Sequence, residues 1–172
     1  MIFLKIMLIL ITIILFITIM YFTAYNNLII YKTKIDISNQ KITEKLKEKY
    51  DKMHDFANEI NKIIKKKNYL KEFNNIDINN IDNYELDTLL TNNLSTMISL
   101  KEDNKSLHTK KCDNIINELY NLDQEIQACK KFFNLNNDEL IKLNKGYYKI
   151  VFKIAKININ NSYEIKEPTN LS

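Results

Sequence analysis

Near the start of the 172-residue chain, apolar residues form one nearly continuous block. In three later stretches, apolar residues recur every three or four positions. The block, residues 6–22, contains no charged residue. With residues 1–4 before it and Tyr25 after it, the block reaches the roughly 20 residues that cross a bilayer. Lys5 can extend its ammonium group to the nearer interface, and Tyr21 and Tyr25 stand where an aromatic belt forms. This pattern predicts a transmembrane helix.

A cleaved signal peptide is the alternative. Such a peptide has an apolar core of about 7–15 residues that ends at a small-x-small site. The core here is longer, and the nearby small residue, Ala24, has Phe22 two positions before it. The sequence therefore favours an uncleaved anchor over a signal peptide, and over a buried helix of a soluble domain.

The lysines beside the block predict its orientation. Only Lys5 precedes it, whereas Lys32, Lys34, Lys41 and Lys45 follow it. The positive-inside rule therefore places a short N-terminus outside the cell membrane and the rest of this single-pass chain in the cytoplasm. Two cysteines fit a reducing compartment, since Cys112 and Cys129 lie too far apart along one predicted helix to form a disulfide.

Three amphipathic helices are predicted beyond the block: from the anchor to about residue 68, over about 84–101, and over about 112–147. Residues 73–84 and 104–110 are expected to be a loop and a turn. The first seam reads Ile35, Ile42, Leu46, Tyr50, Met53, Ala57, Ile60 and Ile64, and the second reads Leu86, Leu90, Leu94 and Met97. The third reads Cys112, Ile115, Leu119, Leu122, Ile126, Cys129, Phe133, Asn136, Leu140, Leu143 and Tyr147. Lys130 is expected to lie off the buried face. Asn136 is either a buried, register-fixing residue or a half-exposed one near a helix end.

The tail at residues 147–159 has two interpretations. It either folds back as a fourth core helix, or lies on the lipid surface with its lysines toward headgroups and Phe152 and Ile154 toward acyl chains. The lysines of the second interpretation, a candidate membrane-surface site, are Lys149, Lys153 and Lys156.

Composition narrows the fold class. One Gly and one Pro are too few for the turns of most all-β folds or for a phosphate-binding glycine loop. We therefore predict an all-α protein: a transmembrane anchor (1–31), a long antiparallel three- to four-helix bundle (32–159) and a disordered C-terminal tail (160–172). The net charge of +4 comes from 25 Lys without any Arg, which is not the basic stripe of a nucleic-acid-binding protein.

Candidate chemistry is sparse. His54 has only Asp51 and Asp55 nearby in the sequence, which indicates a solvated helix face. Cys112 follows His108 by four residues, but it falls on the buried seam without a third, orienting group. We predict no catalytic, cofactor-binding or metal site, and hence no enzyme.

The order of these segments resembles the LemA family of bacterial membrane-anchored helical proteins. The matching residues are Tyr25, Asn26 and Leu28 after the span, then Ile35, Asp36 and Ile42, then a block over residues 45–56. A late motif is matched by Glu118, Leu119, Asp123, Ile126, Lys130, Lys131, Phe133 and Asn134. The chain departs from the family at His54 and Lys52, which replace Pro and Leu, and at residues 103–104, which replace a Tyr-Pro turn.

The resemblance implies a single-span anchor carrying an antiparallel helical bundle, without a defined activity. We therefore expect a structural or interaction protein that scaffolds a partner or acts in cell-envelope or membrane organisation. The alternative is an adaptor for a membrane protease or export system. Expected partners are the lipid bilayer, another protein, and a second copy of the chain in a homo-oligomer.

Overall fold

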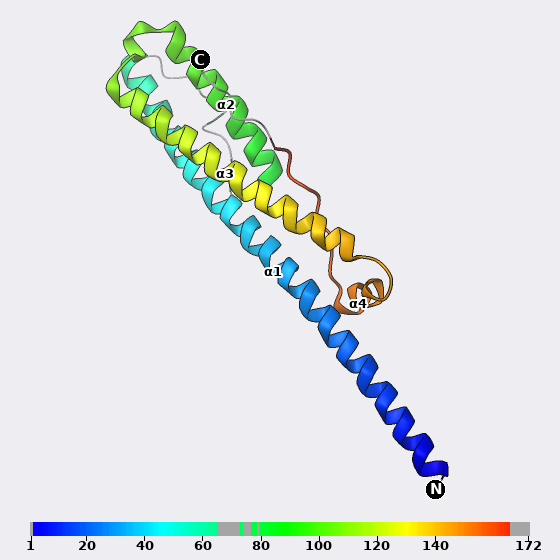
Figure 1. Ribbon diagram of the computed structural model, residues 1–172. Helices are drawn as coiled ribbons and strands as arrows, with labels where there is room; N and C mark the ends of the chain where they lie inside the picture. Colours follow the sequence, from blue (N-terminus) through cyan, green and yellow to red (C-terminus); the bar gives the residue numbers. More distant parts are fainter. Residues whose placement is uncertain (1, 65–72, 74–76, 79, 166–172) are drawn as a thin grey trace. The chain divides into compact units, whose positions relative to one another are not determined.

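The computed structural model describes residues 2–64, 73, 77–78 and 80–165, and this part of the chain is all-α. The helices are α1 (Ile2–Ile64), α2 (Asn83–Asp103), the short 3-10 helix η2 (Lys105–Leu107), α3 (Lys110–Leu143) and α4 (Tyr148–Ala155) (Figure 1). The predicted all-α class, with one long apolar N-terminal helix, is confirmed. Residues 65–68, the predicted end of the first helix, lie outside the described residues.

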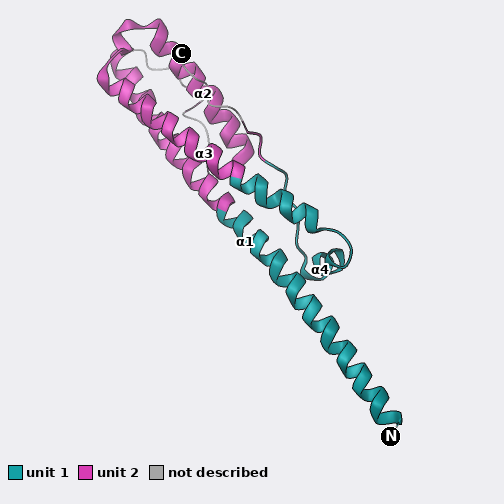
Figure 2. Cartoon of the chain, in the orientation of Figure 1, with its two compact units in different colours: residues 1–37, 132–162 teal, residues 38–131, 163–172 magenta. Residues whose placement is uncertain are grey.

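The chain divides into two compact units, coloured separately in Figure 2. Unit 1 consists of residues 1–37 and 132–162, and unit 2 of residues 38–131 and 163–172. Both α1 and α3 contribute to each unit, so the units do not coincide with the predicted anchor, bundle and tail.

The helix ends have local causes. Asp82 caps α2, because its carboxylate accepts hydrogen bonds from the backbone N–H groups of Tyr84 (2.8 Å) and Glu85 (2.9 Å). Helix α3 ends at Leu143, four residues before the predicted end. The chain's single glycine, Gly146, follows with φ of +54°, a backbone conformation that glycine adopts without strain.

Ion pairs show that α1 and α3 run antiparallel within unit 2. As residue numbers rise along α1, those of the ion-pair partners on α3 fall: Lys45–Glu125, Lys52–Glu118 and Glu59–Lys111, each at 2.6 Å. Helix α2 is also antiparallel to α3, since Asp87 pairs with Lys130 and Lys101 with Asp113. In the described part of unit 2, α1 and α2 are therefore parallel to each other, and both are antiparallel to α3.

The core largely follows the predicted seams. Most of the seam residues are buried, among them Leu46, Met53, Ile60, Leu94, Leu119, Ile126 and Phe133. On α3 the buried isoleucine is Ile116 and not Ile115, and Cys129 is only half-buried. Asn136 is buried, and its amide donates to the Phe132 carbonyl at 2.7 Å.

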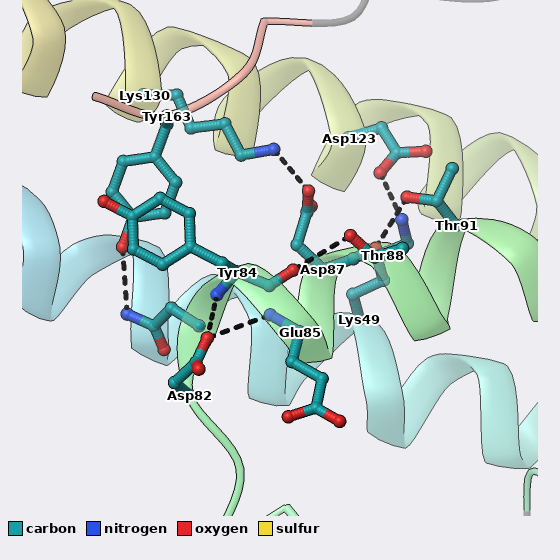
Figure 3. A network of polar contacts seen from close by, with 11 residues as sticks. Lys49, Asp82, Tyr84, Glu85, Asp87, Thr88, Thr91, Asp123, Lys130 and Tyr163 are labelled. Atoms are coloured by element: carbon teal, nitrogen blue, oxygen red, sulfur yellow. Dashed lines mark hydrogen bonds and ion pairs between the residues drawn. The ribbon is translucent and has the colours of Figure 1, made fainter. Parts of the chain in front are cut away.

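Two lysines occupy core positions, which corrects the expectation that Lys130 lies off the buried face. Lys49 is 0% exposed and Lys130 is 1% exposed. Lys49 Nζ lies 2.6 Å from Asp123 Oδ1, and Lys130 Nζ lies 2.6 Å from Asp87 Oδ2 (Figure 3). A buried ammonium group is tolerated only when a charged partner replaces its water, and each carboxylate does so here.

The segment after α4 is held in place up to Tyr163, although disorder was predicted from residue 160. In unit 1, Asn137 Nδ2 donates to the Asn160 carbonyl at 2.8 Å. In unit 2, the Tyr163 hydroxyl donates to Asn39 Oδ1 at 2.6 Å, and its ring stacks on Tyr84 at 4.2 Å. Burial raises the pKa of Tyr163 to about 12. Residues 166–172 of the predicted tail lie outside the described residues.

The pair predicts that Lys130→Ala costs about 3–5 kcal/mol of unfolding free energy, because it leaves the Asp87 carboxylate, which is only 13% exposed, without its partner. Ile126→Ala, which opens a cavity, should cost about 2–5 kcal/mol. Urea unfolding of the detergent-solubilised chain, followed by far-UV circular dichroism, measures both.

The control is Lys131→Ala, at the exposed neighbouring position, which should change stability by less than about 0.5 kcal/mol. The double change Lys130→Met with Asp87→Leu should recover most of the loss, because it removes both buried charges. A Lys130→Ala variant as stable as the Lys131→Ala variant would contradict the buried pair.

Candidate membrane-surface site

The first part of α1 presents an apolar surface on all sides. Every side chain from residue 2 to residue 20 is exposed. Among the described helices, α1 is the one that is long and apolar enough to span a membrane. The hydroxyls of Thr12, Thr18 and Thr23 each donate to the carbonyl four residues earlier, at 2.8–2.9 Å. The polar atoms of these threonines are therefore satisfied within the helix, as a lipid environment requires.

Helix α4 packs in unit 1 together with the segment of α1 that follows this apolar surface. Asn27 Nδ2 donates to the Tyr148 hydroxyl at 3.2 Å. Val151 and Phe152 of α4 are 3% and 5% exposed, and Leu28 of α1 is fully buried. One face of α4 is thus part of the unit's core, as the fourth-core-helix interpretation expected.

The position of Asn27 gives the level of α4 relative to the span. Asn27 lies five residues beyond Phe22, a rise of about 7.5 Å along the helix axis. The headgroup zone on each side of a bilayer is about 5–8 Å thick. If residues 6–22 cross the hydrocarbon core, the Tyr148 hydroxyl lies at headgroup level.

A second sector of α4 and its N-cap residue, next to the buried face, is exposed and apolar. Tyr147 is 43% exposed, Ile150 62% and Ile154 60%. At about 100° per residue, these three positions share a sector of about 60°. The lipid-surface interpretation was therefore wrong about Phe152, which is buried, and the exposed apolar positions are Ile150 and Ile154.

The predicted site lysines all lie to one side of this apolar sector. Lys149, Lys153 and Lys156 are all exposed, and no carboxylate in the described ranges forms an ion pair with them. Lys149 and Lys153 are one turn apart on α4, next to the sector of Ile150 and Ile154. The structure thus brings all three lysines to one short element.

Lys156 terminates α4 in a conformation that lysine seldom adopts. Its φ and ψ of 50° and 42° are left-handed, and its N–H donates to the carbonyls of Phe152 and Lys153. Glycine usually fills this position at a helix end, because a Cβ makes the left-handed conformation costly. A cation therefore stands at a position where backbone geometry favours glycine.

Charge is unevenly divided between the two units. Residues 1–37 and 132–162 contain eight Lys and three acidic residues, a formal charge of +5. The rest of the chain contains 17 Lys and 18 acidic residues, a formal charge of −1. The positive excess of the protein therefore belongs to the unit that contains the apolar run and α4.

Two adjacent phenols mark the start of α4. A hydrogen bond from Tyr147 to the Tyr148 oxygen, followed by the bond from Asn27, lowers the pKa of Tyr148, and the same Tyr147–Tyr148 bond raises the pKa of Tyr147. The two rings lie 4.5 Å apart. Tyrosines with an apolar ring and a hydrogen-bonded tip suit a membrane interface.

The other titratable candidates have structural partners. His54 contacts Asn58 at 3.1 Å and packs near the Phe73 ring, and the His108 ring donates to the Lys101 carbonyl at 3.0 Å. Cys112 is buried and Cys129 half-buried, both as free thiols. Among the described residues, no group of three or more His, Cys, Asp or Glu side chains is arranged to hold a metal ion.

No family model matches the chain, and neither the curated proteins nor the solved structures include a match. Membership of the LemA family is therefore a prediction that rests on the sequence motifs described above.

The backbone at Lys156 predicts that Lys156→Gly stabilises the end of α4, because glycine adopts the left-handed conformation without the Cβ clash. A gain of about 1 kcal/mol, the usual order of this strain, slows local opening about fivefold. Hydrogen exchange of the α4 amides, measured by mass spectrometry, reports this change. Lys153→Gly, within the helix, is the matched control and should speed exchange. Faster exchange in Lys156→Gly would show that the left-handed lysine is not strained.

Proposed function

We propose that the chain is a non-enzymatic, single-span protein of the cell membrane, whose helical bundle serves as an interaction platform at the cytoplasmic membrane surface. The observation that carries this proposal is the exposed, uncharged run over residues 6–22 at the start of α1, in the same unit as the cationic α4. The excess of lysine after the run supports a short outside N-terminus. The resemblance to the LemA family supports the same architecture.

The buried charges of unit 2 fit a platform better than an active site. Buried ionisable groups are often found in active sites, where burial and neighbouring charges tune their pKa values for catalysis. Here Lys49 and Lys130 are each paired with a carboxylate from another helix. Their arrangement supports a role in holding the helices together.

A second candidate function, an adaptor for a membrane protease or export system, is favoured by an apolar pair on α3. Phe132 and Leu135 are 47% and 60% exposed and lie one turn apart, in the unit that contains the anchor. Exposed apolar pairs beside a membrane anchor suit contact with a protein that is itself in the membrane.

The proposed anchor predicts that the full-length protein stays in the membrane pellet after alkaline extraction, and that its mass corresponds to a start at Met1 or Ile2. The reason is the apolar area of residues 6–22, which holds a spanning helix in the bilayer. Release into the supernatant, or a mature start near Tyr25, would identify the segment as a signal peptide and would refute the anchor.

The platform predicts a specific protein neighbour at the exposed apolar pair. A photo-crosslinking residue in place of Leu135, in the full chain in its native membranes, should give a discrete adduct. The same residue in place of Asp138, which is exposed and three positions on, is the matched control and should give less.

Mass spectrometry of the adduct separates the candidates. A protease or export subunit would favour the adaptor, and an adduct between two copies would identify a homo-oligomer. Equal, diffuse labelling from both positions would contradict a docking face at Leu135.

A further inference from the structure

We propose that α4 is an interfacial foot that binds the surface of an anionic phospholipid bilayer beside the chain's own span. Ile150 and Ile154 enter the acyl boundary, while Lys149, Lys153 and Lys156 bind lipid phosphates. This inference rests on the proposed function, because it requires residues 6–22 to be in the membrane.

The first step is proximity. The hydrogen bond between Asn27 and Tyr148 fixes the start of α4 five residues beyond Phe22, at headgroup level. Burial of Val151 and Phe152 fixes which face of α4 turns into unit 1. Because the helix is docked before it meets lipid, it does not have to lose its conformational freedom on binding.

The second step is the chemistry of the free face. A helix that lies in a membrane interface needs an apolar sector with cations beside it. In α4, Lys153 lies next to the sector of Ile150 and Ile154, and Lys149 lies one turn before Lys153. An isolated helix of eight residues would be too short to bind alone, but the span supplies the anchoring. The two isoleucines, each about 60% exposed, have no role in the core of unit 1.

The third step is the choice of lipid. The unit with the anchor carries a formal charge of +5, against −1 for the rest of the chain. Three lysines of that excess lie on or directly after α4, unpaired with any carboxylate of the described residues. Lys156, the third of these lysines, stands at a left-handed position that glycine would fill with less strain. Anionic headgroups complement this charge, whereas a zwitterionic surface does not.

The experiment uses the full chain, because Leu28 and Asn27 belong to the unit that seats α4 and a truncated chain would lose them. The chain, with Cys112 and Cys129 changed to Ala and Ile154 to Cys, carries a fluorescent label at position 154. It is placed in nanodiscs of phosphatidylcholine alone or mixed with phosphatidylglycerol. Quenching by lipids brominated near the headgroup end of their acyl chains reports insertion.

We expect quenching to be several-fold greater in the anionic nanodiscs, and to fall toward the phosphatidylcholine level at high salt. Changing Lys149, Lys153 and Lys156 together to Glu should abolish the difference between the lipids. The matched control changes Lys41, Lys47 and Lys105, which are exposed in unit 2, to Glu and should leave the difference intact. Gln in place of Glu at the three α4 positions should give an intermediate result, with unchanged circular dichroism.

Equal quenching in both lipids, or none in either, would overturn the proposal, as would an α4 variant that behaves like its control. Alkaline extraction keeps this outcome separate from the proposed function. A chain that stays in the pellet but shows no lipid-dependent quenching would refute only the interfacial role of α4. A chain that is released would refute the membrane anchor.

Discussion

The bundle of unit 2 depends on two ammonium groups that are buried among its helices. Lys49 and Lys130 cannot leave water unless Asp123 and Asp87 meet them, so only one register of the three helices satisfies both. Leu, Ile and Met side chains would tolerate a slip of one turn, because another apolar side chain would replace the lost contact. The ion pairs would not, since a slip leaves two buried charges unpaired. The surface pair Lys45–Glu125, which is partly exposed, contributes far less to this choice.

Unit 1 is organised by a different constraint, the end of the apolar run on α1. Helix α1 continues without a break beyond the apolar run. The distance along α1 from the end of this run to Asn27, which binds Tyr148, therefore sets how far from the run α4 packs. The buried pair Val151 and Phe152 then decides the orientation of α4. Once Val151 and Phe152 face the core, the geometry of the helix fixes the directions in which its lysines and isoleucines point.

Periodicity predicted the helices and most of the core, because a repeat of three and four residues reflects burial directly. It missed the burial of Lys49 and was wrong about Lys130, although both fall on the seams: Lys49 is three residues after Leu46, and Lys130 four after Ile126. The sequence of one helix does not reveal that a seam lysine is buried, because its pairing depends on a residue of another helix. The predicted end of α3 failed for a local reason, because the single glycine, Gly146, lay inside the predicted helix.

The two interpretations of the tail are compatible with each other in the structure, because α4 has both a buried and an exposed face. A helix of eight residues has room for a buried face and a free face, and α4 uses Phe152 for the first and Ile154 for the second. The sequence could not divide the apolar residues between these faces, because Val, Phe and Ile suit a protein core and an acyl boundary equally well. The level of α4 depends on Asn27, 121 residues earlier, which meets Tyr148 only in the folded chain. A site of this kind is therefore defined by the docking of the helix and not by the motif within it.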